Sequence, residues 1–131
     1  MNLLLDTHAL LWFERNSPRL GRRARGLIRS SENIVWVSAA SLWEISIKAS
    51  LNRSRMYESF IEVAAGALEL HGFRPLPINF QHALAVRNLP NHHRDPFDHM
   101  LIAQAQCEGL TLVTADPVIC AYGIRTIDAS Q

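Results

Sequence analysis

The stretch HRDPFDHMLIAQAQCEGLTLVTAD, residues 93–116, decides the fold of this chain. Asp95 followed by Pro96 is typical of a helix that begins with an N-cap and a proline at its first position. The largely apolar residues that follow run to Gly109, where we expect the helix to end. Residues 110–113 are apolar or β-branched and bounded by turn-forming residues, so they predict a short buried strand.

Two carboxylates mark these two elements. Asp98 lies in the first turn of the predicted helix, where the helix dipole favours a negative charge. Asp116 lies just beyond the predicted strand, and Thr114 precedes it by two residues. We therefore expect acidic side chains at the start of the helix and at the end of the strand.

The remaining sequence repeats this alternation of helix and strand. Its spacing predicts strands at 3–5, 34–37, 124–127 and, at a proline-containing edge, 73–78; it predicts helices at 7–13, 18–29, 38–51, 57–70 and 79–89, with a loop at 52–55. Such alternation predicts an α/β fold with a parallel sheet covered on both faces. At this length we expect residues 1–131 to form a single domain.

The net charge of +1 identifies no partner, but the distribution of arginine is uneven. Residues 15–29 hold six arginines and no acid. Because phosphate contacts dominate nucleic-acid affinity, one hypothesis is that this segment holds a polyanionic strand. The alternative is an ordinary solvated helix face.

The sequence contains no signal for export or membrane insertion. The N-terminal apolar run is interrupted by Asp6 and His8, and no apolar run approaches the ~20 residues that a membrane span requires. Two cysteines are too few for a disulfide framework. We expect a cytoplasmic protein with no membrane partner.

Acidic residues recur at predicted strand ends and on one apolar helix. Asp6 and Asp116 each follow a buried strand, so they should open onto the same edge of the sheet. Glu44 is the only acid in the predicted 38–51 helix, and Lys48 lies one turn away. Singly, capping or a helical salt bridge explains each acid. Together with Asp98 they would repel one another in one crevice, which favours a Mg²⁺ or Mn²⁺ site.

Four segments along the chain resemble the successive motifs of one family. They are LLLDTHALLW near the start, VSAASLWEISIK, RDPFDHMLIAQA and LTLVTADPVI near the end. In this order and spacing they resemble PIN-domain ribonucleases, and most of all the VapC-type toxins of type II toxin–antitoxin pairs. The resemblance covers nearly the whole chain.

This resemblance implies a three-layer α/β/α PIN-like domain with a central parallel sheet of four to five strands. It implies Mg²⁺- or Mn²⁺-dependent endoribonuclease activity that leaves 5′-phosphate and 3′-hydroxyl ends. The family's acidic quartet falls on Asp6, Glu44, Asp98 and Asp116, and its hydroxyl falls on Thr114. The resemblance also implies an RNA substrate, a homodimer and inhibition by a small cognate antitoxin.

Several neighbouring residues have open roles. Asp95 is assigned mainly to capping, and the alternative is support of a metal ligand. His99 stands where this branch often has arginine; it is either a proton donor or, as we favour, a surface or supporting histidine. The pair His92–His93 resembles a soft-metal ligand set, but adjacent residues on a polar loop are poorly placed to chelate one ion, so we expect both to be exposed.

Two other functions are compatible with these residues. One is a non-catalytic binding module whose acidic pocket receives a basic partner segment. The other is an aspartyl-phosphate phosphotransfer domain with Asp6 as the nucleophile. The second is the weaker, because His8 stands where phosphatases of that type carry a second acid.

Overall fold

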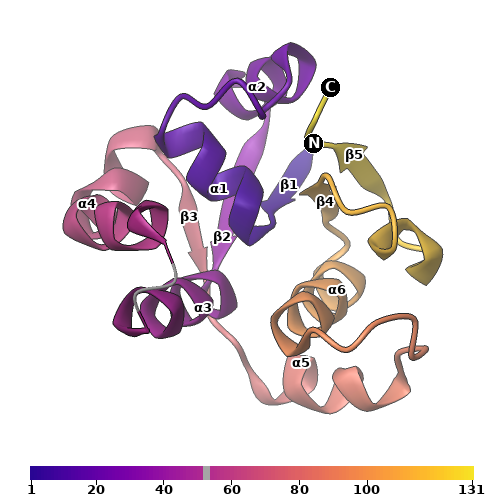
Figure 1. The fold of residues 1–131 in the computed structure, drawn as a ribbon. Helices are drawn as coiled ribbons and strands as arrows, with labels where there is room; N and C mark the ends of the chain where they lie inside the picture. The colour runs from indigo at the N-terminus through magenta and orange to yellow at the C-terminus, as the bar shows by residue number, and fades with distance from the viewer. Residues whose placement is uncertain (52–53) are drawn as a thin grey trace.

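The computed structural model describes residues 1–51 and 54–131, and within them five strands form one parallel sheet (Figure 1). The strands are β1 (Asn2–Leu5), β2 (Ile34–Ser38), β3 (Arg74–Leu76), β4 (Thr111–Thr114) and β5 (Thr126–Asp128). Their order is β3-β2-β1-β4-β5, and every neighbouring pair is parallel. The predicted parallel sheet of four to five strands, with β3 at an edge, is confirmed.

The helices connect these strands as the spacing predicted. They are α1 (Thr7–Glu14), α2 (Arg22–Arg29), α3 (Ala39–Ser50), α4 (Arg55–His71), α5 (Phe80–Ala85) and α6 (Pro96–Glu108), with short 3₁₀ turns η1 (Val86–Asn88) and η2 (Ile119–Tyr122). No helix in the described part of the chain is long and apolar enough to cross a membrane.

Two predicted boundaries near α2 and α4 differ from the structure. The helix expected from residue 18 begins only at Arg22, because the preceding residues turn to receive the C-terminus: the Gly21 N–H donates to the Ala129 carbonyl at 2.9 Å, and a Cβ on Gly21 would lie 2.2 Å from Gln131. The predicted loop at 52–55 ends earlier, since Ser54 caps α4 and Arg55 begins it; residues 52–53 lie outside the described part.

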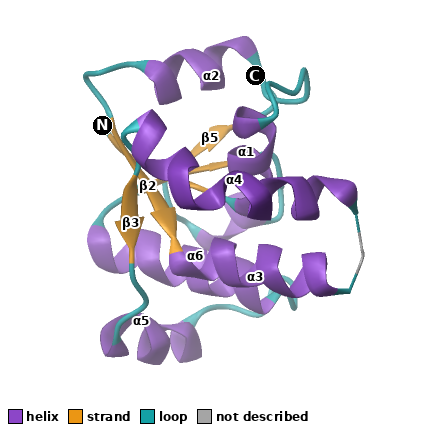
Figure 2. Ribbon diagram, turned by 90° about the vertical axis from the view of Figure 1, so that its left-hand side faces the viewer, coloured by secondary structure: helices purple, strands orange, loops and turns teal. Residues whose placement is uncertain are grey.

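The sheet is covered on both faces. Leu3 and Leu5 of β1 point to one face, where they pack with side chains of α1, α2 and α4, and Leu4 points to the other, where α6 lies. All three leucines are fully buried. This alternation explains the three layers, in which α1 and α4 cover one face of the sheet and α6 covers the other (Figure 2).

The topology also determines where a site can form. From β1 the chain adds β2 and β3 on one side, then crosses over through α5 and α6 to add β4 and β5 on the other. The strand order therefore reverses between β1 and β4, and ligands of such sheets bind beyond the carboxyl ends at this switch point. The Asp6 N–H donates to the Val113 carbonyl at 3.0 Å, which holds the two strand ends side by side.

Candidate functional site

Asp6 lies at the switch point, directly after β1. Its Oδ1 accepts the Ala9 N–H at 2.8 Å, so it caps α1 as predicted, and the residue is only 6% exposed. Burial raises the pKa of Asp6 above its ordinary value, although hydrogen bonds from Thr114 and Ala9 act in the opposite direction. A nearby Glu44 charge adds to the increase. The carboxylate is thus fixed in position and poorly solvated.

Glu44 reaches the same region from α3 and is also buried. The Thr7 hydroxyl donates to its Oε1 at 2.6 Å, and Lys48 pairs with its Oε2. Burial acts to lower the pKa of Lys48, but the bond and charge of Glu44 raise it above its ordinary value. The predicted ion pair is therefore present, and it partly neutralises Glu44.

Asp98, in the first turn of α6, is the acid on which the charges of the other predicted site acids act. It follows Asp95, whose Oδ1 accepts two N–H groups of the first turn of α6 at 2.9 and 3.2 Å, as an N-cap should. Burial raises the pKa of Asp98 to about 8, and the charges of Asp95, Asp6, Glu44 and Asp116 all contribute. The charges of the other three members of the predicted quartet therefore act on Asp98, and in the described residues Asp98 and Asp116 belong to a group of ligand atoms within 4.8 Å of one another.

Asp116 and Thr114 form a turn at the end of β4. The Thr114 hydroxyl accepts the Asp116 N–H at 3.1 Å, and the Asp116 Oδ1 accepts the Val118 N–H at 2.9 Å. Thr114 is buried and also bonds to Asp6. It therefore links the two acids that follow β1 and β4.

The expectation that His93 is exposed is wrong. The His93 ring turns inward, where it stacks on His99 with centroids 5.2 Å apart, and the backbone N–H of His93 donates to the Tyr122 hydroxyl at 3.2 Å. These contacts from α6 and η2 hold the loop against the site. Sequence spacing does not predict the contacts of His93 with His99 and Tyr122, because these partners are polar or distant along the chain. His93 is therefore the site residue that the sequence analysis missed.

His93 lies directly beside the acids. Its Nε2 is 3.6 Å from the Asp98 Oδ2, and ligand atoms of His93, Asp98 and Asp116 all lie within 4.8 Å of one another. Both ring nitrogens are buried without a hydrogen-bond partner. His92, in contrast, is exposed as expected.

His99 makes a different contact. Its Nε2 lies 3.1 Å from the Tyr122 hydroxyl, and the residue is half-buried. The ring thus bonds to η2, and the supporting role of His99 stays a prediction.

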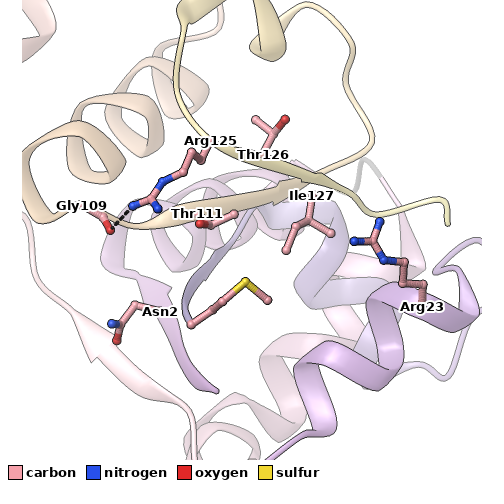
Figure 3. A pocket seen from close by; sticks show the side chains of 8 residues that line it. Asn2, Arg23, Gly109, Thr111, Arg125, Thr126 and Ile127 are labelled. Carbon is pink, nitrogen blue, oxygen red and sulfur yellow. Dashed lines mark hydrogen bonds between the residues drawn. The ribbon is translucent and has the colours of Figure 1, made fainter. Parts of the chain in front are cut away.

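One hollow lies away from the acids. A cavity of about 490 Å³ opens at the amino ends of β1, β4 and β5, where Asn2, Thr111 and Thr126 line it together with Arg23 and Arg125 (Figure 3). No acidic side chain lines it. At least one arginine of the 15–29 segment therefore faces the edge of the sheet opposite the carboxylates, and RNA contact by that segment stays a prediction.

The donor set fits a divalent cation. Buried carboxylates that repel one another need a positive charge, and Mg²⁺ and Mn²⁺ prefer such oxygens. The two unpartnered nitrogens of His93 are a second sign of a missing partner, because buried polar atoms are almost always hydrogen-bonded.

A doubly wound parallel sheet with acidic side chains at its switch point defines an α/β domain of the kind that binds ligands beyond the carboxyl ends of its strands. The family model described as "PIN domain" matches residues 3–124, and the chain belongs to this family. No curated protein matches the sequence.

Solved structures show the same fold over nearly the whole chain. FitAcB from Neisseria gonorrhoeae is 21% identical with a TM-score of 0.71, and 97% of each chain is covered. VapBC from Salmonella typhimurium, bound to DNA, is 20% identical with a TM-score of 0.71 and 98% of each chain covered. VapC20 from Mycobacterium tuberculosis, described as a Sarcin-Ricin loop cleaving toxin, is 17% identical with a TM-score of 0.67, covering 96% of this chain and 98% of that chain. The predicted resemblance to PIN domains and VapC-type proteins is confirmed.

Proposed function

We propose that the protein is a Mg²⁺- or Mn²⁺-dependent endoribonuclease that acts as the toxin of a toxin–antitoxin pair. One observation carries the proposal: burial raises the pKa of Asp98 to about 8, and the charges of Asp95, Asp6, Glu44 and Asp116 add to the increase. PIN domains are typically nucleases, and VapC20 is described as a Sarcin-Ricin loop cleaving toxin, which supports RNA as the substrate. We propose that the protein acts in the cytoplasm, because its proposed substrate, RNA, is found there.

Asp6, Glu44, Asp98 and Asp116 are the proposed metal ligands. The bound ions would activate water and neutralise charge on the phosphodiester. Asp6 is held by a backbone N–H and the Thr114 hydroxyl, so it keeps its position without the metal. Lys48 holds the Glu44 side chain and is in reach of a substrate phosphate only if that pair opens.

The proposed partners are a cognate antitoxin and a second copy of the chain. Several large apolar side chains lie exposed: Phe80 and Leu84, one turn apart on α5, are 90% and 75% exposed, and Trp43 on α3 is 59% exposed. Exposed apolar surface of this kind is typical of interaction sites. Two of the similar structures are named for pairs of proteins, FitAB and VapBC. This supports the proposal that the present chain also binds a partner protein, its antitoxin.

Cleavage of RNA by the purified, partner-free protein tests the activity. We expect cleavage with Mg²⁺ or Mn²⁺, none in EDTA, and a loss of at least about 100-fold in Asp6→Asn and Asp116→Asn. Asparagine is also a good N-cap, so α1 should keep its start in Asp6→Asn. Glu58→Gln, an exposed change on α4, is the control and should cleave normally.

Folded protein that cleaves no RNA with either ion would instead favour the non-catalytic binding module. The antitoxin has a separate test. A small protein encoded beside this gene should copurify with the chain and suppress cleavage, and recovery of free, active protein without such a neighbour would contradict that part.

A further inference from the structure

We propose that His93 is a nitrogen ligand of the metal centre and shifts its preference from Mg²⁺ toward Mn²⁺. The inference rests on the proposed function, since it concerns the same site. It adds an imidazole to a set of ligands that the sequence predicts to be all oxygen.

The first argument is the state of the His93 ring. Both ring nitrogens are buried, and neither has a hydrogen-bond partner. Leaving one buried polar atom unpaired costs about 1–3 kcal/mol, so a native protein rarely leaves two on one ring. The Asp98 Oδ2 lies 3.6 Å from the His93 Nε2, which is too far for a hydrogen bond.

The second argument is the distance itself. With bonds of about 2.1 Å, two ligands of one ion are separated by about 3.0 Å in an octahedral site and about 3.4 Å in a tetrahedral one. The 3.6 Å between His93 and Asp98 is close to these values. Asp116 completes a group within 4.8 Å, so all three could bind one ion once the longest separation closes by at most about 1.4 Å for a tetrahedral site or about 1.8 Å for an octahedral one.

The third argument is that the ring is held in place. It stacks on His99 at an interplanar angle of 28°, and the His93 N–H donates to Tyr122. A loop residue fixed from α6 and η2 in this way has lost the freedom to turn outward. Its neighbour His92 shows the contrast, because it is exposed on the same loop.

The consequence is a choice between ions. Imidazole nitrogen suits transition metals, whereas Mg²⁺ prefers oxygen ligands and water. Affinity for Mn²⁺ should therefore depend on His93 more strongly than affinity for Mg²⁺. We expect loss of the ring nitrogens to reduce the preference for Mn²⁺ over Mg²⁺ about tenfold.

Pulsed electron paramagnetic resonance of Mn²⁺-loaded protein tests this without measuring activity. Wild type should show coupling between Mn²⁺ and a directly bound imidazole nitrogen. His93→Phe keeps a ring for the stack on His99 and should lose that coupling, while the matched change His92→Phe should keep it. His93→Gln serves as a second variant if the phenylalanine disturbs folding, and it should lose the coupling as well.

Dissociation constants for Mn²⁺ and Mg²⁺ complete the experiment. A wild-type site that binds Mn²⁺ without nitrogen coupling, or coupling that persists in folded His93→Phe, would overturn the role of His93 and leave the carboxylate site intact. Wild type that binds neither ion would overturn the proposed function itself.

Discussion

Asp98→Asn should make the metal-free protein more stable. Asp98 is partly buried among four other carboxylates, and this raises its pKa from 3.8 to about 8. The folded protein therefore binds a proton between these two pH values that the unfolded chain does not. Asparagine has nearly the same shape and carries no charge, so it removes the penalty without creating a cavity.

The size of the effect follows from the pKa. A change of one in pKa corresponds to about 1.36 kcal/mol, so the full difference is about 6 kcal/mol as an upper bound. The Asp98 side chain is 20% exposed, and solvent screening reduces this value, so we expect about 3 kcal/mol at pH 8. For a chain of this length that is about 10 °C in melting temperature.

The stability that Asp98→Asn gains over the wild type depends on pH. Below pH 3.8 both states of the wild type hold the proton, and the variant should gain nothing. As pH rises toward about 8, the stability of the wild type falls because its unfolded state releases the proton first, so the gain of the variant should grow and then level off. Urea unfolding in EDTA from pH 4 to pH 9 measures this curve. A variant that is no more stable at pH 8, or whose gain does not change with pH, refutes the reasoning; Glu58→Gln is the control.

Three further changes test single contacts by urea unfolding. Gly109→Ala should cost about 1 kcal/mol, because φ at this C-cap is +66° and no steric contact adds to the backbone strain; no loss would mean that the turn adapts. Gln104→Leu should cost about 2 kcal/mol, since its buried amide oxygen accepts the Ser38 hydroxyl at 2.5 Å. In that background Ser38→Ala should cost only about 1 kcal/mol, because its N-cap bond to the Ala40 N–H is all that is left to lose. Lys48→Met should cost about 1–2 kcal/mol in EDTA by leaving Glu44 unpaired, and a neutral result would mean that the pair contributes nothing.

The sequence predicted those parts of the fold in which local chemistry and burial agree. Leu3–Leu5 could be read as a doubly buried strand because every residue in it is apolar. Asp95–Pro96 and Gly109 could be read as the start and end of α6 because capping depends on the residue and its immediate neighbours. Asp6 and Asp116 then follow from topology, since parallel strands bring their carboxyl ends to one edge.

The rest depends on contacts between distant segments. The late start of α2 is caused by Gln131 lying against Gly21, which no local pattern contains. His93 is held inward by Tyr122 and His99, so a loop that the polar sequence predicts to be exposed carries a ring whose two nitrogens are buried. The sequence alone also does not show which acid has the most raised pKa. The high pKa of Asp98 results from burial, from the charge of its own N-cap Asp95 and from the charges of three acids on other segments.

The repulsion that destabilises the free protein is also what a metal ion would relieve. If the carboxylates are ligands, Mg²⁺ at 100 times its dissociation constant should stabilise the wild type by about 2.7 kcal/mol, close to the expected gain from Asp98→Asn. The variant has less repulsion and one ligand fewer, so Mg²⁺ should stabilise it far less. The difference between the two proteins at pH 8 should therefore nearly vanish when Mg²⁺ replaces EDTA. Equal stabilisation of both by Mg²⁺ would mean that Asp98 is a strained carboxylate with no part in binding the ion.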